Sequence, residues 1–235
     1  MKIILSLFIY LLIINASLAN SLEELYLQSI LINSNDENLY SDPNDIVIGN
    51  KNGDVTIVEF FDYNCGYCKQ ALSDINTLIS NDKNLRVILK DYPILNENSY
   101  DLAKLSIAAG LQGKYFEFHN NILKQKGRIS YQGALDIASD IGLDREKLEE
   151  DFNGKHVKDV IANNKVLGYS LAVSGTPAYF IGDIRVPGAV GYKRLEEFIA
   201  FARKNGMNSF SNYVSDLSLI GDQEAIQLMD RYSLE

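Results

Sequence analysis

The sequence has few of the residues that metal sites and anion-binding surfaces require. Its 235 residues include two cysteines and two histidines, and 22 Lys and Arg stand against 31 Asp and Glu. The net charge of −9 argues against binding to nucleic acid or to an anionic membrane surface, because both need clustered positive charge. With 46% hydrophobic and 23% charged residues, the composition is that of an ordinary globular protein.

Long hydrophobic runs are also scarce. The run nearest the N-terminus covers residues 3–14, follows Lys2, and precedes small residues at Ser17 and Ala19. This layout is typical of a secretory signal peptide cleaved near Ala19/Asn20, and the run is shorter than the roughly 20 apolar residues of a membrane-spanning helix. The sequence therefore predicts export, with an uncleaved interfacial anchor or a buried first helix as the alternatives.

The two cysteines, Cys65 and Cys68, form a C-x-x-C pair. Structural disulfides in exported proteins usually close long loops, so a pair this close cannot brace the fold and its role has to be chemical. A structural zinc site normally needs four Cys or His ligands, and only His119 and His156 remain, both far from the pair in sequence. Covalent haem attachment would need a histidine directly after the second cysteine, where Lys69 stands. The pattern favours redox chemistry without a metal.

Strand and helix patterns surround this pair. Residues 55–61 are mostly β-branched and aromatic, which predicts a buried strand. Apolar residues at helical spacing predict a helix from the cysteines to about residue 79, and residues 85–92 predict a second strand. Strand, helix and strand form a βαβ unit with parallel strands. Cys65 would then lie at the first turn of the helix.

The rest of the chain divides into helices and one hairpin. Five helical patterns separated by glycines predict a helical insertion over about residues 97–173. Residues 178–186 predict a β-hairpin, and a helix follows to residue 205. The predicted segments are a signal peptide (1–19), a helical and irregular N-terminal extension (20–50), a catalytic domain (51–205), and a tail with one short helix capped by Asp222 (206–235).

Thiol–disulfide exchange needs a thiolate, an accessible sulfur and a second thiol that resolves the mixed disulfide. A free cysteine has a pKa near 8.5, so only about 3% of it is ionised at pH 7. At a helix N-terminus, unpaired N–H groups and the positive end of the helix dipole lower that pKa. We therefore expect Cys65 to be the accessible nucleophile and Cys68, one turn further along, to be the shielded resolving thiol.

Two segments carry a family resemblance. The sequence GDVTIVEFFDYNCGYCK, residues 53–69, resembles the DsbA family of bacterial periplasmic proteins and is most similar to its C-G-Y-C branch, which includes the ScsC-type proteins. The sequence GTPAYFI, residues 175–181, resembles the cis-proline loop of the same family. The resemblance covers roughly residues 42–205. It implies an α/β thioredoxin-like fold, with the helical insertion between a βαβ half and a C-terminal ββα half.

The resemblance also implies roles for single residues. Pro177 would be cis and lie against the cysteine pair, and Thr176 would offer backbone pairing to an extended substrate peptide. Glu59 would be a buried carboxyl that relays a proton to and from Cys68, with Lys90 as its charged partner; a solvated Lys90 is the alternative. A carboxylate within an apolar strand is costly unless it is paired or functional, which independently favours a role for Glu59.

The residues between the cysteines, Gly66 and Tyr67, mark a departure within the family. In the family that the sequence resembles, the strongly oxidising members carry a histidine at the position of Tyr67. This chain therefore lacks that thiolate-stabilising group. The C-G-Y-C branch includes isomerase-like oligomers that associate through extra N-terminal residues. A stripe with Leu22, Leu25 and Tyr26 could join copies of this chain in the same way, or pack on its own domain.

Together the patterns and the resemblance imply a periplasmic protein disulfide oxidoreductase or isomerase that needs no cofactor. Its partners would be exported client proteins with thiols or disulfides, and a membrane redox partner that resets the cysteine pair. The alternative is a copper-binding or copper-tolerance protein of the same fold, whose two thiols would serve as soft ligands for Cu(I). A scaffold with an unreactive Cys65 is a third interpretation.

Overall fold

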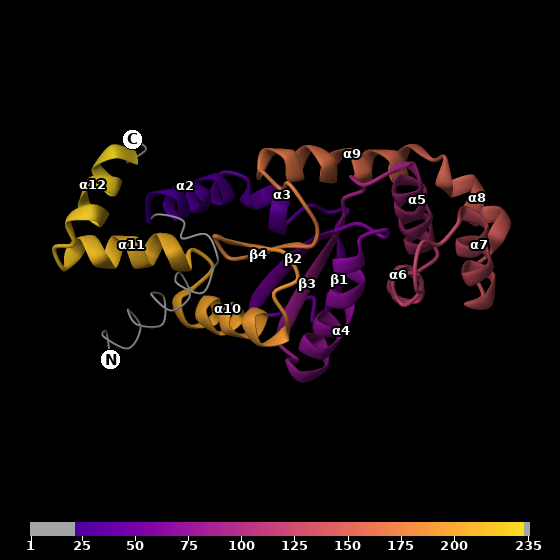
Figure 1. The fold of residues 1–235 in the computed structure, drawn as a ribbon, viewed down its shortest axis with the longest axis horizontal. Helices are drawn as coiled ribbons and strands as arrows, with labels where there is room; N and C mark the ends of the chain where they lie inside the picture. Colours follow the sequence, from indigo (N-terminus) through magenta and orange to yellow (C-terminus); the bar gives the residue numbers. More distant parts are fainter. Residues whose placement is uncertain (1–21, 233–235) are drawn as a thin grey trace.

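The structure is a computed structural model that describes residues 22–232, without the side chain of Leu228. The predicted signal peptide, residues 1–19, lies outside the described residues. A five-stranded sheet forms the centre of the molecule and is covered by helices on both faces (Figure 1). Within residues 22–232, none of the helices combines the length and the apolar character needed to cross a bilayer.

The sheet contains both parallel and antiparallel strands. Its strands are β1 (Ile46–Gly49), β2 (Val55–Phe61), β3 (Leu85–Asp91), β4 (Ala178–Ile181) and β5 (Ile184–Pro187). They lie in the order β1-β3-β2-β4-β5, where β2 and β3 are parallel and the other neighbouring pairs are antiparallel. The predicted βαβ unit and hairpin are both present. Strand β1 was not predicted, and it extends the sheet into the range assigned to the N-terminal extension.

Helix α2 (Leu22–Asn33) contacts the edge strand β5, and four further helices pack on the sheet. They are α3 (Asp36–Tyr40), α4 (Gly66–Asn81), α9 (Lys155–Ser170) and α10 (Tyr192–Asn205). Helices α4 and α10 cover one face and α3 and α9 the other, so that the central strand β2 is buried along its whole length. Burial on both faces explains why residues 55–61 are almost continuously apolar. Glu59 is the one charged residue among them.

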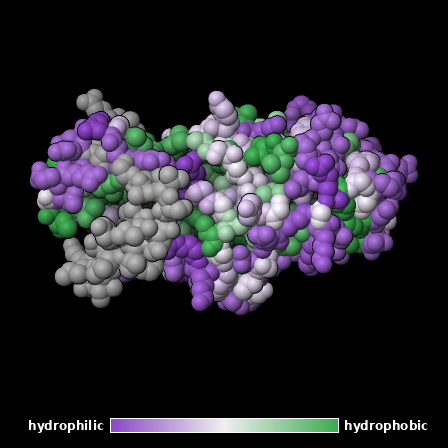
Figure 2. All heavy atoms as spheres, viewed as in Figure 1, coloured by the Kyte–Doolittle hydropathy of each residue, from purple (hydrophilic) through white to green (hydrophobic). Residues whose placement is uncertain are grey.

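The helical insertion lies to one side of the sheet, at the right of Figure 1. Together with α9 it consists of α5 (Glu97–Leu111), α6 (Tyr115–Leu123), α7 (Tyr131–Asp140) and α8 (Arg145–Phe152). The side chains of Asn96, Ser130 and Asp144 cap α5, α7 and α8, each accepting a hydrogen bond from the N–H three residues later. The predicted insertion between the two halves of a thioredoxin-like fold is therefore confirmed. Its surface on the face in Figure 2 is largely hydrophilic.

The C-terminal tail differs from its prediction, because it holds two helices instead of one. These are α11 (Ser209–Leu219) and α12 (Gln223–Tyr232), and only α12, with its cap at Asp222, was predicted. Both helices contact α2 (Leu22–Asn33). The buried side chains of Phe210 and Val214 pack there with Leu22, Leu25 and Tyr26. The N-terminal stripe is thus in contact with the tail of the same chain.

Candidate active site

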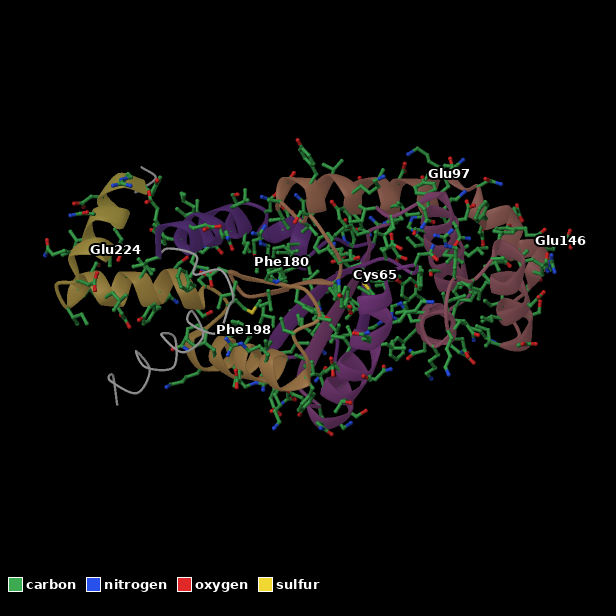
Figure 3. The ribbon with its side chains drawn as sticks, in the orientation of Figure 1. Cys65, Glu97, Glu146, Phe180, Phe198 and Glu224 are labelled. Carbon is green, nitrogen blue, oxygen red and sulfur yellow. The ribbon has the colours of Figure 1, made fainter. Side chains whose placement is uncertain are left out.

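The C-x-x-C pair lies at the junction of β2 and α4. Strand β2 ends at Phe61 and α4 begins at Gly66, so Cys65 is the N-cap residue of the helix. The N–H of Cys68 donates a hydrogen bond to Sγ of Cys65 over 3.4 Å. The prediction that Cys65 lies at the first turn is therefore confirmed, and its sulfur occupies the place where a capping oxygen would accept from the helix N-terminus. Figure 3 labels Cys65 at this end of α4.

The two sulfurs have opposite electrostatic environments. A hydrogen bond with the Cys68 side chain, helped by the backbone N–H groups of Tyr67 and Cys68, lowers the pKa of Cys65 to about 6 although partial burial opposes it. Burial raises the pKa of Cys68 far above its usual range, and its hydrogen bond to Cys65 and the charge of Glu59 act in the same direction. At pH 7 the thiolate form of Cys65 is then favoured, whereas Cys68 keeps its proton.

Access to Cys65 is narrower than the sequence predicts. Both cysteines are free thiols; Cys65 is 6% exposed and Cys68 is 1% exposed. The loop before β4 lies against Cys65, whose Sγ in the thiol form donates a hydrogen bond to the Thr176 carbonyl over 3.1 Å. Tyr67 on the other side is 65% exposed. Cys65 is therefore the more exposed of the two residues, but it is buried, and the prediction of an accessible sulfur is not confirmed.

The loop before β4 contains the predicted cis peptide bond, between Thr176 and Pro177. The carbonyl of Pro177 accepts a hydrogen bond from the N–H of Gly188 over 2.8 Å, which ties the loop to the end of β5. Oγ1 of Thr176 is buried and has no hydrogen-bond partner among the described residues. The loop thus places Thr176 and Pro177 beside Cys65, as the resemblance implies.

Glu59 lies in the middle of β2 and is 4% exposed. Its neighbours at alternate positions, Ile57 and Phe61, pack in the same core cluster as Leu72 and Ile75 of α4, so Glu59 points to the face that α4 covers. Burial raises the pKa of Glu59 to about 8, and the charges of Cys65 and Asp74 act in the same direction. A carboxyl with this pKa exchanges its proton close to neutral pH.

Lys90 is not the partner of Glu59, and this prediction is wrong. The register of β2 and β3 aligns Lys90 with Phe60, so its side chain lies on the opposite face of the sheet from Glu59. There it is 1% exposed, pairs with Asp45, and donates a hydrogen bond to the carbonyl of Asn38 over 3.1 Å. The solvated alternative is also wrong. The sequence does not reveal the strand register that decides the side of the sheet.

Two residues that precede Cys65 were missed by the sequence analysis. The Asp62 carboxylate accepts hydrogen bonds from the N–H of Asn64 over 2.8 Å and from those of Ile94 and Leu95 over 3.0 Å. Nδ2 of Asn64 donates to acceptors at the start of α5, among them Oδ1 of Asn98 at 2.9 Å. These bonds fix the approach to Cys65 against the helical insertion. Their partners lie about 30 residues away in the chain, so no local pattern points to them.

A comparison with known families gives the site its context. The sequence model of the family described as DSBA-like thioredoxin domain matches residues 56–200. The chain belongs to this family. The matched residues include the C-x-x-C pair, the helical insertion and the cis-proline loop, so the DsbA-like region contains every part of the site described above.

Solved structures with the same DsbA-like fold agree with the resemblance seen in the sequence. A thioredoxin-like oxidoreductase from Silicibacter pomeroyi is 40% identical, with a TM-score of 0.70 over 72% of this chain and 97% of the other. The thiol-disulfide exchange protein alpha-DsbA2 from Wolbachia pipientis is 33% identical, with a TM-score of 0.70 over 74% and 95%. The catalytic domain of Proteus mirabilis ScsC is 25% identical, with a TM-score of 0.68 over 75% and 98%.

Curated relatives of the chain include much longer proteins. The chain spans 24% of the length of the Na(+)/H(+) antiporters named NhaA of two Salinispora species, with 67% of its own residues in the match. The likeness therefore concerns one part of those proteins.

Proposed function

We propose that this chain is a thiol–disulfide oxidoreductase that acts on exported proteins through Cys65 and Cys68. The observation that carries the proposal is the difference between the two sulfurs. Cys65 has a pKa lowered to about 6 at the N-terminus of α4, whereas burial keeps Cys68 protonated beside it. Thiol–disulfide exchange needs one ionised sulfur that attacks the client and a second, protonated sulfur that later resolves the mixed disulfide. Membership of the DSBA-like family supports the same activity.

The proposed reaction has two steps. The Cys65 thiolate attacks one sulfur of a client disulfide; the client S–S bond breaks, and the second client sulfur leaves as a thiolate. Once Cys65 is in the mixed disulfide, its negative charge no longer raises the pKa of Glu59, so the ionised form of Glu59 can accept the proton of Cys68. Cys68 then attacks the sulfur of Cys65. A Cys65–Cys68 disulfide forms, and the first client sulfur leaves with the electron pair of the mixed disulfide. The reverse sequence transfers a disulfide to a client dithiol, and attack by a client's own thiol gives isomerisation.

The residues around the sulfurs would bind the client chain. Thr176 and Pro177 lie against Cys65, where the Thr176 carbonyl is 3.1 Å from its sulfur. Gly66 and Tyr67, which follow Cys65 at the start of α4, are exposed. An extended client segment that reaches Cys65 would pass between these two pairs. The client sulfur would replace the hydrogen bond that the Cys65 thiol donates to the Thr176 carbonyl.

The direction of the reaction is proposed from the acidity of Cys65. In strongly oxidising DsbA the nucleophilic cysteine has a pKa of about 3.5, and in thioredoxin about 7. The pKa of about 6 in this chain lies nearer the second value, and Tyr67 brings no positive charge between the cysteines. We therefore favour isomerisation over strong oxidation. The signal-like residues 1–19 support a periplasmic location, where a membrane redox partner would reset the pair.

Refolding of ribonuclease tests the proposal. Wild-type protein should accelerate the recovery of activity from scrambled ribonuclease more than the oxidation of reduced ribonuclease, and Cys65→Ser should abolish both. Cys68→Ser should keep part of the isomerase activity, because client thiols can still resolve the mixed disulfide. A folded wild-type protein that is inactive on both substrates would contradict the proposal. Activity on reduced ribonuclease alone would show that the protein is an oxidase and not an isomerase.

The copper-binding alternative has weaker support. Within residues 22–232 there is no group of three or more His, Cys, Asp or Glu that could hold a metal ion. His119 is buried against Phe61 and Tyr115, and its burial lowers its pKa to about 3. Cu(I) would have to be bound by Cys65 and Cys68 alone, and Cys68 would first have to lose its proton from a buried position.

A further inference from the structure

A groove lined by residues of α4 that follow the cysteine pair has no part in the reaction described above. It lies between α4 and the segment that follows α6, and its volume is about 580 Å³. Lys69, the residue after Cys68, lies at its wall, so the groove begins within one residue of the pair. A groove of this size is large enough for several side chains of a bound segment.

The rim of the groove is positive on a protein whose net charge is −9. The segment after α6 reads Lys124-Gln125-Lys126-Gly127-Arg128, and all five residues are exposed. No Asp or Glu lines the groove. Within the part of the chain that the structure describes, none of Lys69, Lys124, Lys126 or Arg128 forms an ion pair.

The floor and the walls of the groove are built into the fold. Leu72 of α4 and Leu123 of α6 line it and are almost fully buried as residues. Nζ of Lys69 donates hydrogen bonds to the carbonyls of Gln125, over 2.9 Å, and of Gly127, which hold the positive segment against the active-site helix. The backbone on either side of Lys126 is thereby tied to Lys69, the residue after Cys68.

We propose that this groove binds an acidic, extended segment of the protein whose disulfide or thiol reacts with Cys65. The proposal rests on the proposed function and adds the class of substrate. Complementary charge favours an acidic partner, and the apolar floor at Leu72 and Leu123 favours a polypeptide, whose apolar side chains can alternate with carboxylates. The electrostatic attraction is local, because charges more than about 8 Å apart are largely screened at physiological ionic strength. The acidic remainder of the surface therefore does not cancel it.

The test uses the full chain as Cys68→Ser, in which Cys65 forms a mixed disulfide that is not resolved. The probes are peptides with one cysteine in a disulfide with 2-mercaptoethanol, which leaves as its thiolate when Cys65 attacks. Two peptides carry a block of Asp and Glu before or after the cysteine, and a third carries Asn and Gln instead. At physiological salt we expect at least one acidic peptide to react faster than the neutral peptide. Two exposed ion pairs correspond to a roughly twofold to thirtyfold preference.

Two double variants locate the preference. Lys124→Gln/Lys126→Gln should bring the ratio of the acidic to the neutral rate constant close to one, and high salt should do the same. Lys51→Gln/Lys83→Gln removes the same charge from exposed positions near the opposite end of α4, and should leave both rate constants unchanged. A ratio that is the same in both double variants would overturn the proposal.

The remaining outcomes separate the two proposals. If no peptide reacts with Cys65, the proposed function fails and the charge preference fails with it. If all peptides react at equal rates, the proposed function stands and the acidic substrate class is wrong. In a third outcome, the wild-type protein binds phosphatidylglycerol vesicles, loses this binding in Lys124→Gln/Lys126→Gln, and shows no peptide preference. That result would assign the positive rim to a lipid surface and overturn the proposal.

Discussion

Three buried carboxyl groups make the stability of the folded protein depend on pH. Burial raises the pKa of Glu59 and of Asp91 to about 8, and that of Asp45 to about 6 although Lys90 lies beside it. In the unfolded chain these groups titrate near pH 4. Between about pH 4 and 8 the folded state therefore binds more protons than the unfolded state. The free energy of unfolding must fall as the pH rises through this window.

Glu59→Gln should flatten this dependence in the reduced protein. Between about pH 5 and 7.5 the wild-type carboxyl is protonated when folded and ionised when unfolded, so it contributes one proton to the difference. Its removal should reduce the slope of the unfolding free energy by up to about 1.4 kcal/mol per pH unit. Urea unfolding at several pH values measures the slope, with Glu150→Gln on the surface of α8 as the control. An unchanged slope would mean that Glu59 is ionised in the folded protein.

Lys90 should matter for stability and not for redox chemistry. Lys90→Met leaves the Asp45 carboxylate buried without its cation, which should lower the free energy of unfolding by about 3–5 kcal/mol. Adding Asp45→Asn should recover part of this loss. The pKa of Cys65 should not change in either variant, because Lys90 lies on the other face of the sheet. A shifted pKa of Cys65 with nearly unchanged stability would restore the role that the resemblance implied.

The elements that the sequence predicted are those with strong local patterns. Strand β2, helix α4 and the capped helices of the insertion have their periodicity and their caps within a few adjacent residues. Strand β1 has only four residues between two turns, which is too short to show a period. Helix α11, with the sequence SFSNYVSDLSL, contains four serines, which are weak helix formers. Its position in the fold depends on hydrogen bonds with a residue far away in the chain.

Asp183 is the distant partner on which α11 depends. It is 1% exposed, between β4 and β5, and its carboxylate accepts hydrogen bonds from the first N–H groups of α11, at Phe210 and Ser211, both over 2.8 Å. Asp183→Ala should cost about 1–3 kcal/mol and should speed hydrogen exchange in α11 and α12 more than in the sheet. Asp216→Ala, at an exposed position on α11, is the matched control. Equal exchange in both variants would show that the cap does not hold the tail.

For the whole molecule, the sequence predicted the fold class, the C-x-x-C pair, the cis-proline loop and the buried Glu59, partly from residues and partly from the family resemblance. What it could not predict depends on long-range placement. The side of the sheet on which Lys90 lies follows from the register of β3, and the bonds of Asp62 join segments about 30 residues apart. The restricted exposure of Cys65 arises because the loop at Thr176, more than 100 residues away, packs against it.

The packing of the N-terminal stripe bears on the oligomeric state. Leu22, Leu25 and Tyr26 pack with Phe210 and Val214 of the same chain, which leaves these three side chains partly buried. We predict that the chain without residues 1–19 sediments as a monomer at micromolar concentration. A sedimentation coefficient that rises with concentration, and falls back when Leu25 is replaced by Ser, would show that the N-terminal extension links chains after all.

The central claim is that Cys65 is ionised near neutral pH and can be reached from solvent, whereas Cys68 is neither. The most direct test is the rate of alkylation of the reduced protein by iodoacetamide across the range from about pH 4 to pH 9, with the modified residue identified by mass spectrometry. The account predicts modification of Cys65 alone, with a rate that rises through an inflection near pH 6. An inflection near 8.5, as in a free cysteine, or equal modification of both cysteines, would contradict it.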